Sequence, residues 1–148
     1  MEIGEAPSET LCPDSNHPHM IDLGLPNDAK IACKNEGTTK PEETGNSYTW
    51  DEAISLCKDK GYRLLTEDEI RELVLNCRHE YMTINETKGQ MITASNGKRI
   101  FLPLGGYWSC DVSSDGNPYY MYVLENDVQW ARTEKSERKL VRPIYSLP

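Results

Sequence analysis

The sequence predicts an α+β fold, because two helical segments come first and a run of short strands follows. Each helical segment has its own start signal, a Thr followed three residues later by a Glu. After residue 77 the apolar residues alternate as in β-strands, and an Asn-Gly pair marks a tight hairpin. Helices followed by strands indicate an α+β fold rather than the regular βαβ order of an α/β fold.

The first helix is predicted to start at Thr49 and to end at Gly61. Glu52 completes a capping box with Thr49, and a glycine commonly ends a helix in the left-handed conformation. One face of this helix is apolar, and its residues are Trp50, Ala53, Ile54 and Cys57.

The second helix is predicted to start at Thr66, with Glu69 as the partner in its capping box. Its apolar residues recur at the spacing i, i+3, i+4, i+7, and they are Ile70, Leu73, Val74 and Cys77. The link between the helices reads GYRLL, which is too short for anything but an extended segment or a tight turn.

Strand signals follow the helices. Asn96-Gly97 lies between two alternating runs and predicts a hairpin with a type I′ turn, because both residues tolerate positive φ. A second hairpin is predicted to turn near 125–127, within YYMYVLENDVQWA. The final strand is predicted in LVRPIY, where Pro143 indicates an edge position or a strand end.

The chain has 148 residues, which is the size of one domain and enough to bury a core. We divide it into a polar N-terminal tail, 1–18, and a single domain, 19–148. The tail has no apolar h-region, so it is not a secretory signal as it stands. We expect either that the protein is not exported or that a leader is absent from this sequence.

Charge and hydropathy restrict the partners. The net charge of −8 would repel phosphate backbones, so nucleic acid is not an expected partner. No segment approaches the ~20 apolar residues that a membrane span needs, so no span is expected. The sequence leaves the oligomeric state open.

The chain has five cysteines, and this odd number leaves at least one thiol free if all pairing is internal. No CxxC occurs, and the spacing excludes a zinc ribbon or a thioredoxin-type site. Buried thiols and one or two disulfides both remain open, with no connectivity predicted. The residues are Cys12, Cys33, Cys57, Cys77 and Cys110.

Four runs along residues 20–145 carry a family resemblance. They are IDLGLPNDAKIACKNEGTTKPEETG, TWDEAISLCKDKGYRLLTEDEIREL, NGKRIFLPLGGYWSCD and KLVRPIY. Each run resembles one part of a single family. The first resembles its entry segment, and the second resembles its two helices with their Gly-x-Arg-Leu-Pro-Thr link. The third resembles its Asn-Gly hairpin with a Gly-Tyr-Trp-Ser-Ser core, and the fourth resembles its closing strand. The family is the Fibrobacter succinogenes major paralogous domain family, common in surface and secreted proteins of Bacteroidetes.

The resemblance implies a C-type-lectin-like fold related to that of formylglycine-generating enzymes. Such a fold has two short helices packed on small twisted antiparallel sheets, with adjacent N- and C-terminal strands, here 20–23 near 140–144. The resemblance also implies an extracellular or cell-surface location, with a cytoplasmic location as the open alternative. The chain departs from the family at Leu65, which replaces a Pro, and at Cys110, which replaces a Ser, and it nearly lacks the insert before GYWS.

We expect no enzymatic activity and no cofactor. GxSxG, HExxH and Walker-type motifs do not occur in the sequence. His79 is expected to be an exposed residue after the second helix. Cys110 lies beside Asp111, and a neighbouring carboxylate raises the pKa of a thiol, which disfavours a reactive cysteine.

Calcium is an alternative to a plain polar turn in the run DVSSDGN. The oxygen side chains of Asp111, Ser113 and Asp115 and a glycine at the sixth position are similar to the opening of a calcium loop. Tyr122 stands where such a loop has a bidentate Glu. We therefore expect no metal and a turn rich in Asp, Ser and Gly.

The functional hypothesis is a non-enzymatic binding or adhesion module that recognises a glycan or a host or bacterial surface protein. Polar and aromatic side chains of the expected loop 111–120 and strand 129–132 would supply hydrogen bonds and stacking. The candidate ligand-binding residues are Asp111, Ser113, Asp115, Asn117, Tyr119, Gln129, Trp130 and Arg132. Trp108, in contrast, is expected in the core. Two alternatives stay open: a divergent formylglycine-generating-enzyme-like oxidase, and a retroelement-diversified variable ligand-binding protein.

Overall fold

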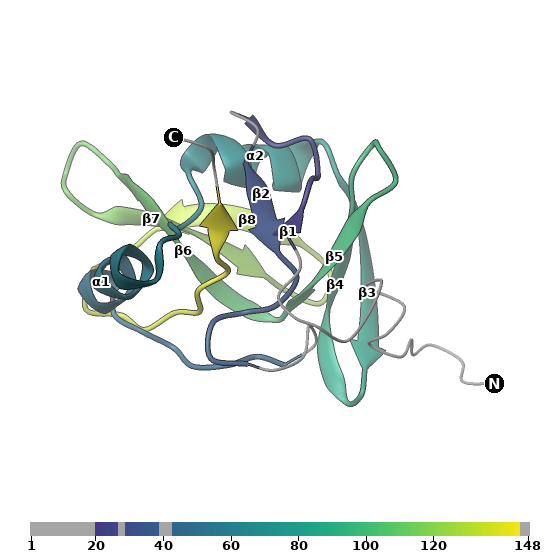
Figure 1. Ribbon diagram of the computed structural model, residues 1–148, viewed down its shortest axis with the longest axis horizontal. Coiled ribbons are helices and arrows are strands. Elements are labelled where there is room, and N and C mark those ends of the chain that lie inside the picture. The colour runs from purple at the N-terminus through teal and green to yellow at the C-terminus, as the bar shows by residue number, and fades with distance from the viewer. Residues whose placement is uncertain (1–19, 27–28, 39–42, 146–148) are drawn as a thin grey trace.

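The structure is a computed structural model that describes residues 20–26, 29–38 and 43–145. These residues form two helices and nine strands, and the strands make three antiparallel sheets of three strands each. In the view of Figure 1, α1 and the β6–β7–β8 sheet lie on the left, the β3–β4–β5 sheet lies on the right, and α2 lies at the top. The predicted α+β class is confirmed. The predicted tail, 1–18, lies outside the described residues.

Both predicted helices form at their predicted start signals. In α1 (Trp50–Lys60), Thr49 and Glu52 make a complete capping box, and Gly61 ends the helix with a φ of 81°. In α2 (Glu67–Leu75), Thr66 and Glu69 make the second capping box. The helix starts are therefore encoded locally, by side chains three residues apart.

The second helix is shorter than predicted. It ends at Leu75, and the backbone N–H of Asn76 donates to the carbonyl oxygen of Glu72. Cys77, which the apolar spacing assigned to the helix, lies beyond it because the chain enters a strand at Arg78. The thiol is half-buried against the main core, so its apolar character reflects packing and not continued helix.

The strand after α2 was not predicted from the sequence. β3 (Arg78–Ile84) pairs with β4 (Thr87–Thr93) across a two-residue turn, in which Asn85 and Glu86 have φ values of 47° and 72°. Two positive φ values identify a type I′ turn. His79, expected as an exposed residue, lies half-buried in β3, and its Nε2 is 2.7 Å from the carbonyl oxygen of Leu73.

The Asn96-Gly97 hairpin is confirmed, but its turn type is different. It joins β4 to β5 (Arg99–Pro103), and only Gly97 has a positive φ, of 87°. The N–H of Gly97 donates to the carbonyl of Ala94 at 3.0 Å, and the N–H of Ala94 donates to the carbonyl of Lys98 at 2.8 Å. The loop therefore has three residues with glycine at the left-handed position, and not the two residues of a type I′ turn.

Half of the expected loop 111–120 belongs to strands. β6 (Gly105–Val112) pairs with β7 (Pro118–Val123), and β7 pairs with β8 (Val128–Arg132). Only 113–117 form the β6–β7 turn, closed by a 2.8 Å hydrogen bond from the N–H of Ser113 to the carbonyl of Asn117. The second predicted hairpin turn, near 125–127, is confirmed, since the N–H of Leu124 donates to the carbonyl of Asp127 at 2.8 Å.

The N- and C-terminal strands share a sheet but are not adjacent, contrary to the prediction. β2 (Lys30–Ala32) lies between β1 (Met20–Ile21) and β9 (Ile144–Tyr145). Ile31 pairs with Ile21 on one side and with Ile144 on the other, and its side chain is fully buried. Burying this apolar strand in the centre of the sheet removes it from water, which explains why β2 separates the two outer strands. Pro143 lies just before β9, as a strand end requires.

Trp108 is fully buried, as expected. It packs under α1 in a cluster with Ala53, Cys57, Leu64 and Val141. Its indole N–H donates to the carbonyl oxygen of Tyr48 at 2.7 Å, so the polar atom of the ring is satisfied inside the core.

A buried cation lies between the sheets. Arg142 is 1% exposed, and its Nε donates to Oδ1 of Asn35 at 2.7 Å. Its Nη1 and Nη2 donate to the carbonyl oxygens of Ala32 and Phe101 at 3.0 and 2.6 Å. Arg142 thus joins three segments that are distant in the sequence.

Candidate functional site

The β7–β8 hairpin brings three of the predicted binding residues onto one face. Tyr119 pairs with Arg132, and Met121 pairs with Trp130. Because side chains directly opposite in a sheet lie on the same face, Tyr119, Trp130 and Arg132 point to the same side. This is also the side of the buried Met121, so the group begins in the core and ends at the exposed Arg132.

Asp115, at the tip of the β6–β7 turn, joins this group through an ion pair. One carboxylate oxygen lies 4.0 Å from Nη1 of Arg132. The hydroxyl of Ser113 and the N–H of Asn117 donate to the other, and with Arg132 they hold the pKa of Asp115 below its ordinary value. We call Asp115, Tyr119, Trp130 and Arg132 the hairpin patch.

Trp130 is held in place from the helix side. It is half-buried against the main core, and the guanidinium of Arg71 in α2 lies 5.8 Å from the centroid of its ring. This is the distance of a cation–π contact. The aromatic surface of the hairpin patch is therefore built on two paired strands and a helix rather than on a free loop.

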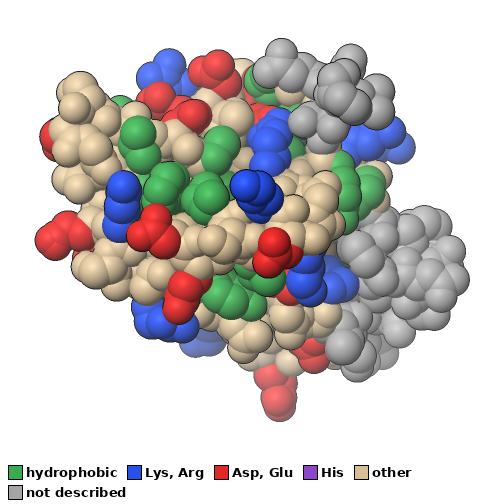
Figure 2. All heavy atoms as spheres, turned by 60° about the vertical axis from the view of Figure 1, so that its left-hand side comes forward, with side chains coloured by type: hydrophobic (Ala, Val, Ile, Leu, Met, Phe, Trp, Pro, Cys, Tyr) green, Lys and Arg blue, Asp and Glu red, His purple; other side chains and the backbone are tan. Residues whose placement is uncertain are grey.

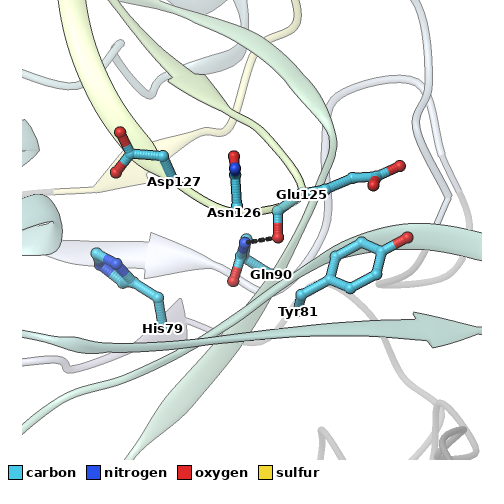
Figure 3. A pocket seen from close by; sticks show the side chains of 6 residues that line it. All are labelled: His79, Tyr81, Gln90, Glu125, Asn126 and Asp127. Carbon is cyan, nitrogen blue, oxygen red and sulfur yellow. Dashed lines mark hydrogen bonds between the residues drawn. The ribbon is translucent and has the colours of Figure 1, made fainter.

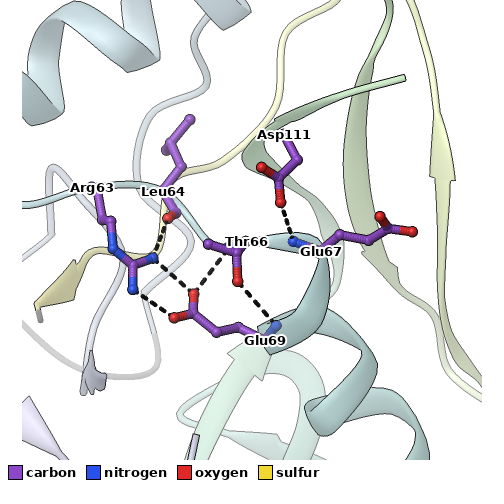
Figure 4. Close-up of polar contacts among 6 residues, drawn as sticks. All are labelled: Arg63, Leu64, Thr66, Glu67, Glu69 and Asp111. Carbon is purple, nitrogen blue, oxygen red and sulfur yellow. Dashed lines mark hydrogen bonds and ion pairs between the residues drawn. The ribbon is translucent and has the colours of Figure 1, made fainter. Parts of the chain in front are cut away.

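Asp111 belongs to the scaffold and not to the predicted binding loop. It lies in β6, and its Oδ2 accepts the N–H of Glu67, the first residue of α2, at 2.7 Å (Figure 4). The first N–H groups of a helix have no partner within the helix, and a carboxylate there also complements the helix dipole. Asp111 thus fixes the start of α2 to the sheet.

The side chains considered for calcium are engaged within the protein. Ser113 is buried and donates its hydroxyl to Asp115, while Asp111 binds α2. In the part of the chain that the structure describes, no group of three or more His, Cys, Asp or Glu side chains is placed to hold a metal ion.

Gln129 lies outside the hairpin patch, and Asn117 supports the patch only through its backbone. Gln129 pairs with Tyr122, which puts it on the opposite face of the sheet, and its Nε2 donates to Asp127 at 3.2 Å. Asn117 contributes its backbone to the β6–β7 turn. The eight predicted residues therefore do not form one continuous site.

A pocket that the sequence did not predict lies between the β3–β4–β5 sheet and the β7–β8 turn (Figure 3). Its volume is about 190 Å³. The lining residues are His79, Tyr81, Gln90, Glu125, Asn126 and Asp127. Three come from β3 and β4 and three from the turn, so the pocket exists only when the two sheets are assembled.

Gln90 forms the floor of this pocket and is 3% exposed. Its Nε2 donates to the carbonyl oxygens of Leu124 and Glu125 at 2.8 and 3.0 Å. These bonds fasten the β7–β8 turn to β4. Tyr81, directly opposite Gln90 in the sheet, has a more exposed ring at the rim.

Cys57, Cys77 and Cys110 are free thiols. Burial raises the pKa of Cys57 to about 12 and that of Cys77 to about 11. Burial and the carboxylate of Asp111 also raise the pKa of Cys110. None of these three thiols has the lowered pKa of a cysteine nucleophile.

The surface mixes apolar and charged groups. Figure 2, which turns the left-hand side of Figure 1 forward, shows hydrophobic side chains in small groups between acidic and basic ones. Four large hydrophobic side chains of the described residues are exposed, and they are Leu75, Tyr81, Val112 and Leu124. No helix in the described part of the chain is long and apolar enough to cross a membrane.

The comparisons with known proteins give no match. No family model matches the chain, and neither a curated protein nor a solved structure is significantly similar to it.

Sequence reasoning missed the pocket because its parts are distant in the chain. Gln90 and Glu125 are 35 residues apart, and no local motif links them. The available signal was the alternation in RHEYMTI, which would have placed His79 and Tyr81 on one face of a strand.

Proposed function

We propose that this chain is a non-enzymatic binding module that recognises a glycan or a surface protein through the hairpin patch. The observation that carries the proposal is the cross-strand pair of Tyr119 and Arg132 with Trp130 on the same face. The proposal includes a C-type-lectin-like scaffold, membership of the family resembled by the four sequence runs, and an extracellular or cell-surface location.

The composition of the hairpin patch favours recognition. Trp, Tyr and Arg are the residue types that most often dominate the binding energy of interfaces. Aromatic rings also stack on sugar rings, while Asp115 and Arg132 offer an acceptor and donors at the rim. Because Tyr119 and Trp130 lie in paired strands, little conformational entropy is lost when a partner binds.

The state of the thiols favours binding over an oxidase role. A formylglycine-generating-enzyme-like reaction would need a reactive cysteine, and the raised pKa of Cys110 keeps it protonated at neutral pH. The hydrogen bond from Glu67 to Asp111 directs this carboxylate to the helix. The polar groups around Cys110 thus serve the scaffold.

The experiment is a binding screen of the full chain against a glycan array and a panel of purified surface proteins. For any ligand found, Tyr119→Ala and Arg132→Ala are expected to lower the affinity at least tenfold each. Tyr122→Ala is the matched control, because Tyr122 is half-exposed on the opposite face of the same strand. Equal losses for Tyr119→Ala and Tyr122→Ala, or no loss for either, would contradict the proposed surface.

A further inference from the structure

We propose that the pocket between the β3–β4–β5 sheet and the β7–β8 turn binds a primary ammonium group on a short alkyl chain. This is the chemistry of a lysine side chain and of a small free amine. The site is separate from the hairpin patch. Tyr119 and Arg132 lie at one end of the β7–β8 hairpin, and the pocket-forming turn lies at the other end.

Two hydrogen bonds fix the orientation of the buried Gln90 amide. A carbonyl oxygen only accepts, so the atom of Gln90 that faces the carbonyls of Leu124 and Glu125 must be the N–H₂ group. The amide oxygen Oε1 then points to the other side, between His79 and Tyr81 (Figure 3). Among the described residues no group donates to Oε1, so a buried acceptor awaits a donor from outside.

The lining of the pocket is rich in acceptors and negative charge. Glu125 and Asp127 are carboxylates, and no Lys or Arg lines the pocket. The ring nitrogen Nε2 of His79 lies 2.7 Å from the carbonyl oxygen of Leu73, which only accepts, so Nε2 donates its proton to α2 and not into the pocket. An ammonium group has three donors and no acceptor, which matches such a lining.

The aromatic ring at the rim and the size of the pocket also suit an alkylammonium group. Tyr81 adjoins Gln90 and offers a π face, to which cations are attracted. The volume of about 190 Å³ equals that of roughly six water molecules at ~30 Å³ each. An alkyl chain of a few carbons with its ammonium head fits this space, whereas a larger ligand would extend beyond the rim.

The experiment is a titration of the full-length chain followed by backbone amide NMR. The probes are n-butylammonium chloride, the neutral 1-butanol of similar size, and the amide of Nα-acetyl-lysine. Saturable shifts at Tyr81, Gln90 and Asn126 are expected with butylammonium and not with butanol, and they should weaken with salt. Tighter binding of the lysine amide than of butylammonium would identify a lysine side chain of a partner protein as the source of the ammonium group. Tighter binding of butylammonium would identify a small free amine.

The variants test the assigned groups. Glu125→Gln with Asp127→Asn is expected to weaken butylammonium binding at least fivefold, while the matched control Glu80→Gln leaves it unchanged. Glu80 carries the same charge but lies on the other face of β3. Gln90→Leu is expected to abolish binding, and Tyr81→Leu, which keeps the turn fastened, to weaken it. Equal shifts with butylammonium and butanol, or full affinity in the double variant, would overturn the proposal.

Discussion

The guanidinium of Arg63 meets the carboxylate of Glu69 in a two-point contact, with Nη1 2.9 Å from Oε1 and Nη2 2.6 Å from Oε2. Glu69 is fully buried, and its Oε1 also accepts the N–H of Thr66 at 2.9 Å (Figure 4). The Glu69 hydrogen bond raises the pKa of Arg63, so the guanidinium keeps its charge. One carboxylate therefore completes the capping box of α2 and fixes the extended link before it.

Glu69→Ala should lower the free energy of unfolding by about 3 kcal/mol, because it leaves a partly buried guanidinium without its carboxylate and removes the cap. Chemical denaturation measures this change. Asp68→Ala, an exposed residue in the same turn, is the control and should change stability by less than about 1 kcal/mol. A loss for Glu69→Ala no larger than that of the control would contradict the role of the pair.

Asp111→Ala should lower the free energy of unfolding by about 1 kcal/mol, because the N–H of Glu67 loses its acceptor at the start of α2. Asp111→Asn keeps an acceptor oxygen and should recover most of the stability. Asp115→Ala, in the exposed turn, is the comparison. Thermal melts of the three variants rank their stabilities. If the Asp111→Ala variant is as stable as the unmodified chain, Asp111 does not stabilise the start of α2 and is again a candidate for ligand binding.

Stability should fall as the pH rises from about 9 to about 12. Burial raises the pKa of Cys57 from 9.0 to about 12 and that of Tyr107 from 10.0 to about 12. In this window the unfolded chain releases these protons while the folded chain keeps them, so fewer protons are bound in the unfolded state and the free energy of unfolding declines.

Urea titrations at several pH values measure that decline. Tyr107→Phe removes one of the two groups and the hydrogen bond from its hydroxyl to Pro103, so it should be less stable at neutral pH but lose less stability above pH 10. The same alkaline slope in this variant would show that the Tyr107 proton does not contribute.

Alkylation by iodoacetamide at pH 8 should be slow at Cys57 and Cys77 in the folded protein. Their pKa values of about 12 and about 11, against 9.0, reduce the thiolate roughly a hundred- to a thousandfold. Cys110 should follow the same trend. Mass spectrometry of each cysteine, with the urea-unfolded chain as control, gives the rates. Rapid folded-state labelling of Cys110 would instead favour the oxidase alternative.

Removal of residues 140–148 should abolish cooperative unfolding. Leu140, Val141 and Ile144 are core residues, and Ile144 also closes the sheet beside Ile31. Circular dichroism melts of the truncated and complete chains test this. A shorter deletion that removes only 146–148 serves as the control and should keep a cooperative melt, since the core residues of β9 stay in place.

The success of the sequence-based predictions follows the distance between the interacting groups. Thr49 and Thr66 bind partners three residues away, so both helix starts were predictable. The role of Asp111 was not, because its partner Glu67 is 44 residues away and the side chain is equally suited to a turn. Gln129 and Trp130 lie on opposite faces because successive side chains of a strand alternate. The pairing of Tyr119 with Arg132, in contrast, depends on the register between β7 and β8, which no local motif sets.

The position of Arg142 has a consequence for the order of folding during synthesis. Its three acceptors come from Asn35, Ala32 and Phe101, which precede it by 107, 110 and 41 residues. A nascent chain that has emerged only as far as β8 holds these acceptors but not the cation that joins them. Contacts of such long separation form late and slowly. The helices and hairpins are therefore made first, and Arg142 joins the β1–β2–β9 sheet to the β3–β4–β5 sheet only after it has left the ribosome.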